Sequence, residues 1–206
     1  MTIQYCTGMA RRHLTPQDWS TAALRAMAHG GVAAVSVNAL AGELGTTRGS
    51  FYWHFKDRDA LLTAALEVWE EDNTTALISE LGDITDPRQR LTALFTTALG
   101  QHDINGLEPA IVAHADHPAV APILRRVTDR RIAYLTDLYT NLGLAPAPAR
   151  RQAVAAYAAY LGWLELRRSA SDIVPEVAIT GTTATAALEH LITELARSGE
   201  HQAKPE

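Results

Sequence analysis

The side chains best suited to chemistry lie between residues 36 and 56, in two short stretches joined at Gly45. Ser36 is expected to cap a first helix, and the apolar residues that follow it recur at helical spacing: Val37, Leu40, Ala41 and Leu44. Gly45 can adopt a left-handed backbone without steric cost, which ends that helix. Two short helices with one glycine turn between them predict a helix-turn-helix.

The second stretch combines small, polar and basic side chains. Thr46 or Thr47 can cap its helix, and Phe51 and Phe55 stand four residues apart, so both can point into a core. The opposite face then presents Arg48, Ser50, Trp53 and His54. A short helix of this composition suits the major groove of DNA, because arginine and small hydroxyl side chains can reach base edges there.

Each polar residue of this region has a predicted role at DNA. Arg48 and Ser50 are expected to contact base edges, and Asn38 either bases or phosphates. Phosphate contacts are expected from Ser36, Thr47, Tyr52, His54 and Lys56. The complete predicted surface is Ser36, Asn38, Thr47, Arg48, Gly49, Ser50, Tyr52, Trp53, His54 and Lys56.

A longer pattern surrounds these residues. It comprises Leu24 to Met27, Gly31, Ser36-Val37, Leu40-Ala41, Leu44-Gly45, Arg48 to Phe55, Arg58 and Leu61-Leu62, and it resembles the N-terminal domain of TetR-type transcriptional regulators. Its most specific part is Tyr-x-His-Phe, then a turn, a basic residue and a Leu-Leu pair. Two positions depart from it, since Val35 stands where a hydroxyl residue is common and Asn38 where arginine is common. Both departures affect DNA contacts rather than the fold.

Charge is distributed unevenly along the chain. The 206 residues carry a formal net charge of −5, yet residues 1–65 sum to +2, which leaves −7 for the rest. The basic residues of the first part are Arg11, Arg12, Arg25, Arg48, Lys56 and Arg58. A basic head on an acidic body is consistent with DNA contact at one end only.

Several classes of function find no support. No apolar run is long enough to cross a bilayer, no signal peptide is expected, and the single cysteine, Cys6, fits a cytoplasmic protein without disulfides. His114, Asp116 and His117 lack the spacing of metal ligands, so no metal or cofactor is expected. No nucleophile, phosphate-loop or metalloprotease motif occurs, and we expect no enzyme.

The remaining pattern predicts helices throughout, hence an all-α fold. Thr15 and Pro16 open a helix that stops at Gly30-Gly31, and a fourth helix runs from Asp57 to about Leu81. Further helices are expected from Asp86 to about His102, and over 108–115, 118–143, 149–169 and 182–197, with 145–148 as a connector. We predict a helix-turn-helix domain over residues 1–56 and a larger ligand-binding and dimerisation domain over 57–206.

Aromatic and imidazole groups recur within the apolar helices of the larger domain. They are Trp69, Phe95, His102, His114, Tyr134, Tyr157, Tyr160 and Trp163. Apolar walls with a few polar tips are typical of a small-molecule cavity, although such side chains can also simply fill a core. The resemblance favours the cavity. The arginines at 125, 126, 130 and 131 could bind an anion, but Asp129 favours a solvated, ion-paired face.

A stripe of small residues suggests close helix packing. Ala155, Ala159, Gly162 and Leu166 share one helical face, and the last helix carries a broad apolar stripe. Both stripes could belong to a monomer core, but the resemblance implies that these two helices pair in a homodimer. The chain is therefore expected to be a ligand-responsive regulator, by resemblance a repressor, that binds a palindromic operator. The alternative is an all-α small-molecule-binding protein or enzyme without DNA binding.

Overall fold

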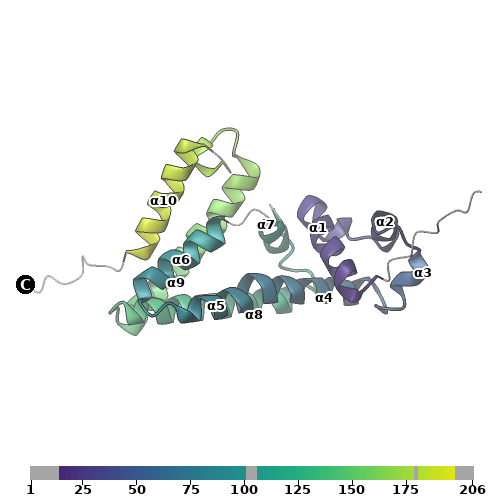
Figure 1. Ribbon diagram of the computed structural model, residues 1–206, viewed down its shortest axis with the longest axis horizontal. Helices are drawn as coiled ribbons and strands as arrows, with labels where there is room; N and C mark the ends of the chain where they lie inside the picture. The colour runs from purple at the N-terminus through teal and green to yellow at the C-terminus, as the bar shows by residue number, and fades with distance from the viewer. Residues whose placement is uncertain (1–13, 101–105, 179–180, 198–206) are drawn as a thin grey trace, which may run out of the picture.

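A computed structural model describes residues 14–100, 106–178 and 181–197, and all regular elements in these ranges are helical. The predicted all-α fold is therefore confirmed. A head of α1, α2 and α3 forms one end of an elongated molecule (Figure 1). Helices α4, α5 and α8 run lengthwise away from it, and α6, α9 and α10 form the other end. No described helix is long and apolar enough to span a membrane.

The head consists of α1 (Pro16–Ala34), α2 (Val37–Glu43) and α3 (Arg48–Phe51). The next two helices, α4 (Arg58–Glu70) and α5 (Ala76–Glu80), together form a segment that we call the rod. The body adds α6 (Pro87–Gly100), α7 (Leu107–Val112), α8 (Ala121–Asn141), α9 (Pro146–Ser169) and α10 (Thr182–Ala196). Short 3₁₀ turns cover Leu81–Asp83 and Pro175–Val177.

Helix α1 begins as predicted and ends later. The Thr15 side chain accepts from the Asp18 backbone N–H, and Asp18 returns a bond to the Thr15 N–H, which completes a capping box. Gly30 and Gly31 kink the helix instead of stopping it, and it continues to Ala34. At Gly31, φ is 65° and ψ is −168°, and an added Cβ would lie 2.4 Å from the His114 ring. Only glycine fits this position.

The helix-turn-helix forms around Gly45, whose φ is 63° as predicted. Thr47 caps α3 by accepting from the Ser50 N–H, whereas Ser36 makes no side-chain bond at the start of α2, so that predicted cap is wrong. Phe51 is fully buried, with its ring 5.4 Å from Trp19 and 5.6 Å from Phe55. Aromatic packing thus holds the short α3 where its own hydrogen bonds are too few.

The predicted long helix after Asp57 is interrupted by a π turn over Glu71–Thr75, between α4 and α5. Asp57 caps α4, accepting from the Ala60 N–H at 2.8 Å. Arg58 donates to the carbonyls of Val32 and Val35, so α4 is anchored to the end of α1. A π turn inserts one extra residue, which shifts the helical face and frees backbone carbonyls for other partners.

Two other predicted boundaries need correction. Residues 145–148 do not form a connector, because α9 already begins at Pro146; prolines are tolerated in a first turn, where the N–H groups have no partner. Helix α8 begins at Ala121 rather than Pro118. Asp86 caps α6 at 2.7 Å as expected, and the predicted end of that helix at His102 lies outside the described residues.

The buried residues form two clusters. The first joins the head to α4, α7 and the start of α8, and includes Trp19, Phe51, Leu61, Trp69 and Val127. The second joins α6, the rest of α8, α9 and α10, and includes Phe95, Leu138, Tyr139, Tyr157 and Ile192. The head therefore shares its core with helices that belong to the body.

Replacing Gly31 should separate steric fit from backbone strain. Gly31→Ala should lower the free energy of unfolding by roughly 1–3 kcal/mol through its φ and ψ, and by a further ~1–3 kcal/mol through contact with His114. The matched control is Gly45→Ala, since Gly45 has a similar φ but no atom within 4 Å of its Cβ position. Urea unfolding of both variants measures the difference, and equal losses would contradict the proposed contact.

Candidate nucleic-acid interface and cavity

The predicted DNA-contacting residues lie together on α2, α3 and the turn after α3, at the end of the molecule farthest from α10 (Figure 1). Most of them are exposed, and Trp53 is 87% and Tyr52 52% exposed. Ser50 and His54 are half-buried. A Cβ at Gly49 would come no closer than 3.6 Å to another atom, so this surface is open. The fold thus places the whole predicted set in the head, at one end of the molecule.

Arg48 is coupled to the tyrosine one turn later. Its Nη2 donates to the Tyr52 hydroxyl at 3.1 Å, and its guanidinium carbon lies 5.8 Å from the ring centre. Arg25, by contrast, pairs with Glu43 at 2.9 Å and ties α1 to α2. The neutral Tyr52 hydroxyl does not compensate the charge of Arg48, whereas the Glu43 carboxylate compensates that of Arg25.

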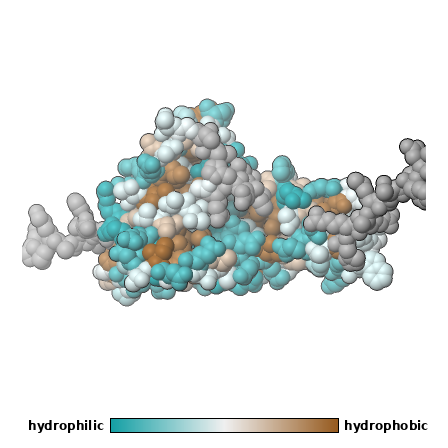
Figure 2. Space-filling model, viewed as in Figure 1, coloured by the Kyte–Doolittle hydropathy of each residue, from teal (hydrophilic) through white to brown (hydrophobic). Residues whose placement is uncertain are grey.

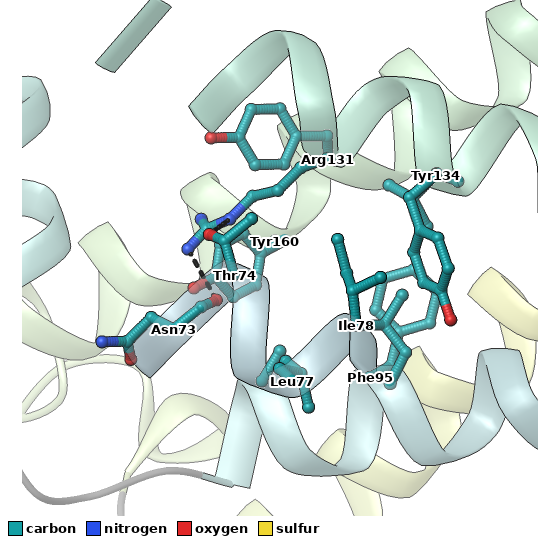
Figure 3. Close-up of a pocket in the computed structure, with 12 residues that line it drawn as sticks. Asn73, Thr74, Leu77, Ile78, Phe95, Arg131, Tyr134 and Tyr160 are labelled. Atoms are coloured by element: carbon teal, nitrogen blue, oxygen red, sulfur yellow. Dashed lines mark hydrogen bonds between the residues drawn. The ribbon is translucent and has the colours of Figure 1, made fainter. Parts of the chain in front are cut away.

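A cavity opens in the body between the π turn, α5, α6, α8 and α9 (Figure 3). Its volume is about 50 Å³, and the empty space reaches about 570 Å³ when the mouth open to solvent is included. The lining residues are Asn73, Thr74, Leu77, Ile78, Leu94, Phe95, Ala98, Arg131, Tyr134, Leu135, Tyr157 and Tyr160. Such a space admits a small ligand, and a larger one requires the walls to move.

Four of the predicted ligand-binding residues line this cavity: Phe95, Tyr134, Tyr157 and Tyr160. Trp69 does not line it but is buried in the first core, beneath the guanidinium of Arg131 at 5.3 Å. His114 bonds to the Ala110 carbonyl and faces Gly31 of the head. Trp163 packs against the second core without lining the cavity, and His102 lies outside the described residues.

Arg131 is the polar centre of the cavity wall and was predicted to lie on a solvated face, which is wrong. Its side chain is 13% exposed, and it donates to Glu108 at 2.5 Å, to Thr74 Oγ1 at 2.9 Å and to the Asn73 carbonyl at 3.1 Å. Burial alone would lower the pKa of Arg131, but the Glu108 carboxylate raises it above its ordinary value. The guanidinium therefore stays charged.

Tyr160 completes this network from α9. Its hydroxyl donates to the second oxygen of Glu108 at 2.9 Å, and its ring centre lies 5.9 Å from the Arg131 guanidinium. Burial, reinforced by the Glu108 charge, raises the pKa of Tyr160 well above 10, so the hydroxyl remains protonated. The network links α7, α8, α9 and the π turn.

The cavity residues that sequence reasoning missed are of three kinds. Leu77, Ile78, Leu94, Ala98 and Leu135 look like any core residues, and no sequence signal marks them. Asn73 and Thr74 line the cavity because of the π turn, which periodicity does not reveal. Only Arg131 had a signal, its place in a basic cluster.

Comparison with known proteins agrees with this geometry. Residues 21–71 match the model for bacterial regulatory proteins of the tetR family. The N-terminal domain is that of a TetR-type regulator. The chain is also similar to the HTH-type transcriptional regulator AcrR of Shigella flexneri, with 41% identity over 56 residues. This aligned segment covers 27% of the present chain. The match spans about a quarter, 25%, of that curated relative.

Solved structures extend the likeness to the TetR fold of the whole chain. A TetR transcriptional regulator from Legionella pneumophila superposes with a TM-score of 0.72 at 14% identity, covering 91% of this chain and 99% of the other. The structure of AibR in complex with isovaleryl coenzyme A and operator DNA gives a TM-score of 0.62 at 16% identity, covering 87% and 96%. At these identities the likeness concerns the fold.

Helix α9 leaves one face uncovered. Ala155 and Gly162 are exposed, Leu166 is 44% exposed, Ala159 is half-buried, and a Cβ at Gly162 would meet nothing within 4 Å. Apolar residues also gather on the surface of the body in the view of Figure 2. Of this stripe, Ala159 packs against the second core, whereas Ala155, Gly162 and Leu166 lie on the surface.

A second ion pair joins the rod to α8 next to the cavity. Glu70 accepts from Arg126 through both carboxylate oxygens, and Arg130 donates to Thr75 in the π turn at 2.7 Å. The hydrogen bond from Arg126 lowers the pKa of Glu70 below its ordinary value, although burial opposes it. The pair contributes to stability while Glu70 is ionised.

Glu70→Gln should lower the free energy of unfolding at pH 7 by about 1 kcal/mol, because Arg126 is half exposed and its attraction is screened. Because the pKa of Glu70 is lowered in the folded state, the ion pair contributes its full share of the free energy of unfolding at pH values above the unfolded-state pKa of about 4.3. That contribution is lost as the pH falls through the folded-state pKa of Glu70. Urea unfolding at pH 7 and pH 3 measures this, with exposed Glu80→Gln as control. A cost that persists at pH 3 would contradict an ionic origin.

Proposed function

We propose that this chain is a one-component transcriptional regulator of the cytoplasm. Its head, residues 1–56, binds a palindromic DNA operator as part of a homodimer, and its body, residues 57–206, binds a small molecule. Binding of that molecule lowers operator affinity, so the resting state represses. The observation that carries the proposal is the exposed surface at α3, which includes Arg48, Tyr52 and Trp53. The buried rings of Trp19 and Phe51 pack beneath this surface and hold α3 in place.

The shape and charge of the head support DNA contact. Arg48 and Ser50 lie on the first turn of α3, where side chains can reach base edges, while Tyr52, His54 and Lys56 follow the helix toward the phosphate backbone. Ser36 and Asn38 flank this surface from the start of α2, and both are exposed. The AibR complex with operator DNA is a further support, because the two folds are alike.

Dimer formation gives this head the affinity that a single short helix lacks. One α3 has few charges, and a two-fold pair reads two half-sites one helical turn apart. The uncovered stripe of α9 supports a partner helix at close range, since exposed small residues allow backbones to approach. Helix α10 lies beside the same end of the body.

The rod offers the mechanical link between cavity and head. Helix α4 is anchored to α1 through Arg58, and the π turn at its other end supplies Asn73 and Thr74 to the cavity wall. A ligand that prefers a shifted π turn would move α4 and thus the spacing of the two heads. Its effect on operator affinity equals its preference for that shifted state.

The alternative function, a small-molecule-binding protein or enzyme without DNA binding, predicts that the α3 face is functionally idle. It gains no specific support from the cavity, which serves both functions equally. DNA binding by the purified chain decides between them.

Arg48→Ala should weaken specific operator binding by about 1–3 kcal/mol and relax preference at one base pair, provided that the contact is bidentate to guanine. Lys56→Ala should weaken binding to all sequences alike and reduce the salt dependence by about one counterion. Fluorescence anisotropy with DNA from upstream of the chain's own gene measures both at several salt concentrations.

The control is Arg150→Ala, because Arg150 is exposed on α9 at the other end of the molecule. It should leave operator affinity unchanged. If Arg48→Ala behaves like this control, Arg48 does not read the operator.

Gly162→Trp should yield monomers or aggregates in sedimentation velocity at micromolar concentration, whereas the native chain should sediment as a dimer. A tryptophan there forces the paired helices apart, with overpacking of roughly 1–3 kcal/mol at each of two symmetric sites. Gly82→Trp is the matched control, since Gly82 is equally open but lies off the stripe. A native monomer would refute the dimer, and a dimeric Gly162→Trp variant would refute this interface.

A further inference from the structure

The cavity presents a positive charge, and its counterion lies behind it. Among the described lining residues Arg131 is the one with an ionised side chain, and Glu108, its partner, is not part of the lining. Figure 3 shows the Arg131 side chain at one side of the cavity, beside Thr74 and Tyr160, with Tyr134 on the other side. A molecule entering the cavity therefore meets the guanidinium before the carboxylate.

Arg131 keeps donors to spare. A guanidinium has five N–H groups. Nε donates its N–H to Thr74, Nη2 donates one N–H to the Asn73 carbonyl, and Nη1 donates one N–H to Glu108. The second N–H of Nη1 and the second N–H of Nη2 therefore have no partner within the described residues. A buried charge with unsatisfied donors gains from an oxygen acceptor.

Two further polar groups of the wall have no partner in the described part of the chain. The hydroxyls of Tyr134 and Tyr157 are buried without a hydrogen bond, and Tyr157 as a whole is only 6% exposed. The rest of the lining is apolar, from Leu77, Ile78, Leu94, Phe95, Ala98 and Leu135. Unsatisfied hydroxyls at these depths indicate a ligand with hydrogen-bonding oxygens on an apolar body.

We propose that the effector of this cavity is a small apolar monocarboxylate, whose carboxylate binds the open N–H groups of Arg131 and whose hydrocarbon or aromatic body packs against α6. This inference rests on the proposed ligand-responsive function and names the ligand class. An ammonium ligand is disfavoured, because it would meet Arg131 first. A neutral amide can satisfy the same hydrogen bonds but lacks the charge attraction, which is strong in a buried site.

The same contact explains how the ligand acts on the head. Glu108 lies on α7, which packs against α1, and His114 just after α7 touches Gly31 at the kink of α1. A second carboxylate, supplied by the ligand, would repel Glu108 and so weaken the ion pair through which Arg131 holds α7. The link between α8 and α7, which itself packs against α1, then becomes weaker.

The test is isothermal titration calorimetry on the full chain without DNA, with benzoate, phenylacetate, hexanoate and decanoate, each compared with its primary amide, and with benzylamine. At least one acid should bind 10-fold or more tighter than its amide, and benzylamine should not bind. If no acid binds, or every acid and amide bind alike, the inference is overturned.

Variants assign the effect to Arg131. Glu108→Gln removes the competing charge and should raise affinity for the acid several-fold, which a merely structural role of Glu108 would not do. The double variant Arg131→Gln with Glu108→Gln leaves no unpaired buried charge and should bind acid and amide alike, with circular dichroism checking its fold. Unchanged acid preference in the double variant would overturn the assignment.

Tyr157→Phe should weaken binding of the acid, since it removes a hydroxyl that has no partner among the described residues, at little cost to folding. Tyr139→Phe is the matched control, because its hydroxyl donates to the Leu195 carbonyl at 2.6 Å, away from the cavity lining. Loss of affinity in the control but not in Tyr157→Phe would contradict the site. Calorimetry without DNA keeps this test separate from operator binding, so either proposal can fail alone.

Discussion

The body of this molecule is organised around one buried positive charge. Arg131 cannot be left unpaired at 13% exposure, so four elements must bring it partners: the π turn offers Thr74 and a carbonyl, α7 offers Glu108, α9 offers Tyr160, and Trp69 lies beneath it. These partners come from segments far apart in the chain. Satisfying the charge therefore fixes how α7, α8, α9 and the rod are placed around the cavity.

The head depends on a different constraint, the brevity of its reading helix. Four residues of α3 cannot form a stable helix by themselves. Thr47 caps the helix, and the Trp19, Phe51 and Phe55 rings hold it from below. These buried aromatic residues thus orient Arg48 and its exposed neighbours, although they have no predicted contact with DNA themselves.

Local signals in the sequence account for what could be predicted. The caps at Thr15, Thr47 and Asp86, the positive φ at Gly45 and the inward direction of Phe51 could all be inferred from neighbours within four residues. The failures involve distant partners. Arg131 looked like one of four surface arginines, because Glu108 is 23 residues away and Thr74 is 57 residues away. Periodicity also did not reveal the π turn, since one inserted residue leaves the apolar pattern nearly intact.

The shared first core has a consequence for how the chain comes apart. Trp19 and Phe51 of the head are buried in the same cluster as Ile111 of α7 and Val127 of α8. The head is therefore not a separate folding unit that happens to be tethered to a sensor. Cooperative unfolding should divide the chain between the two cores, through the middle of α8, rather than at the chain boundary near residue 56. Under the proposed ligand response, a change at the cavity would reach the head through helices that share the head's core.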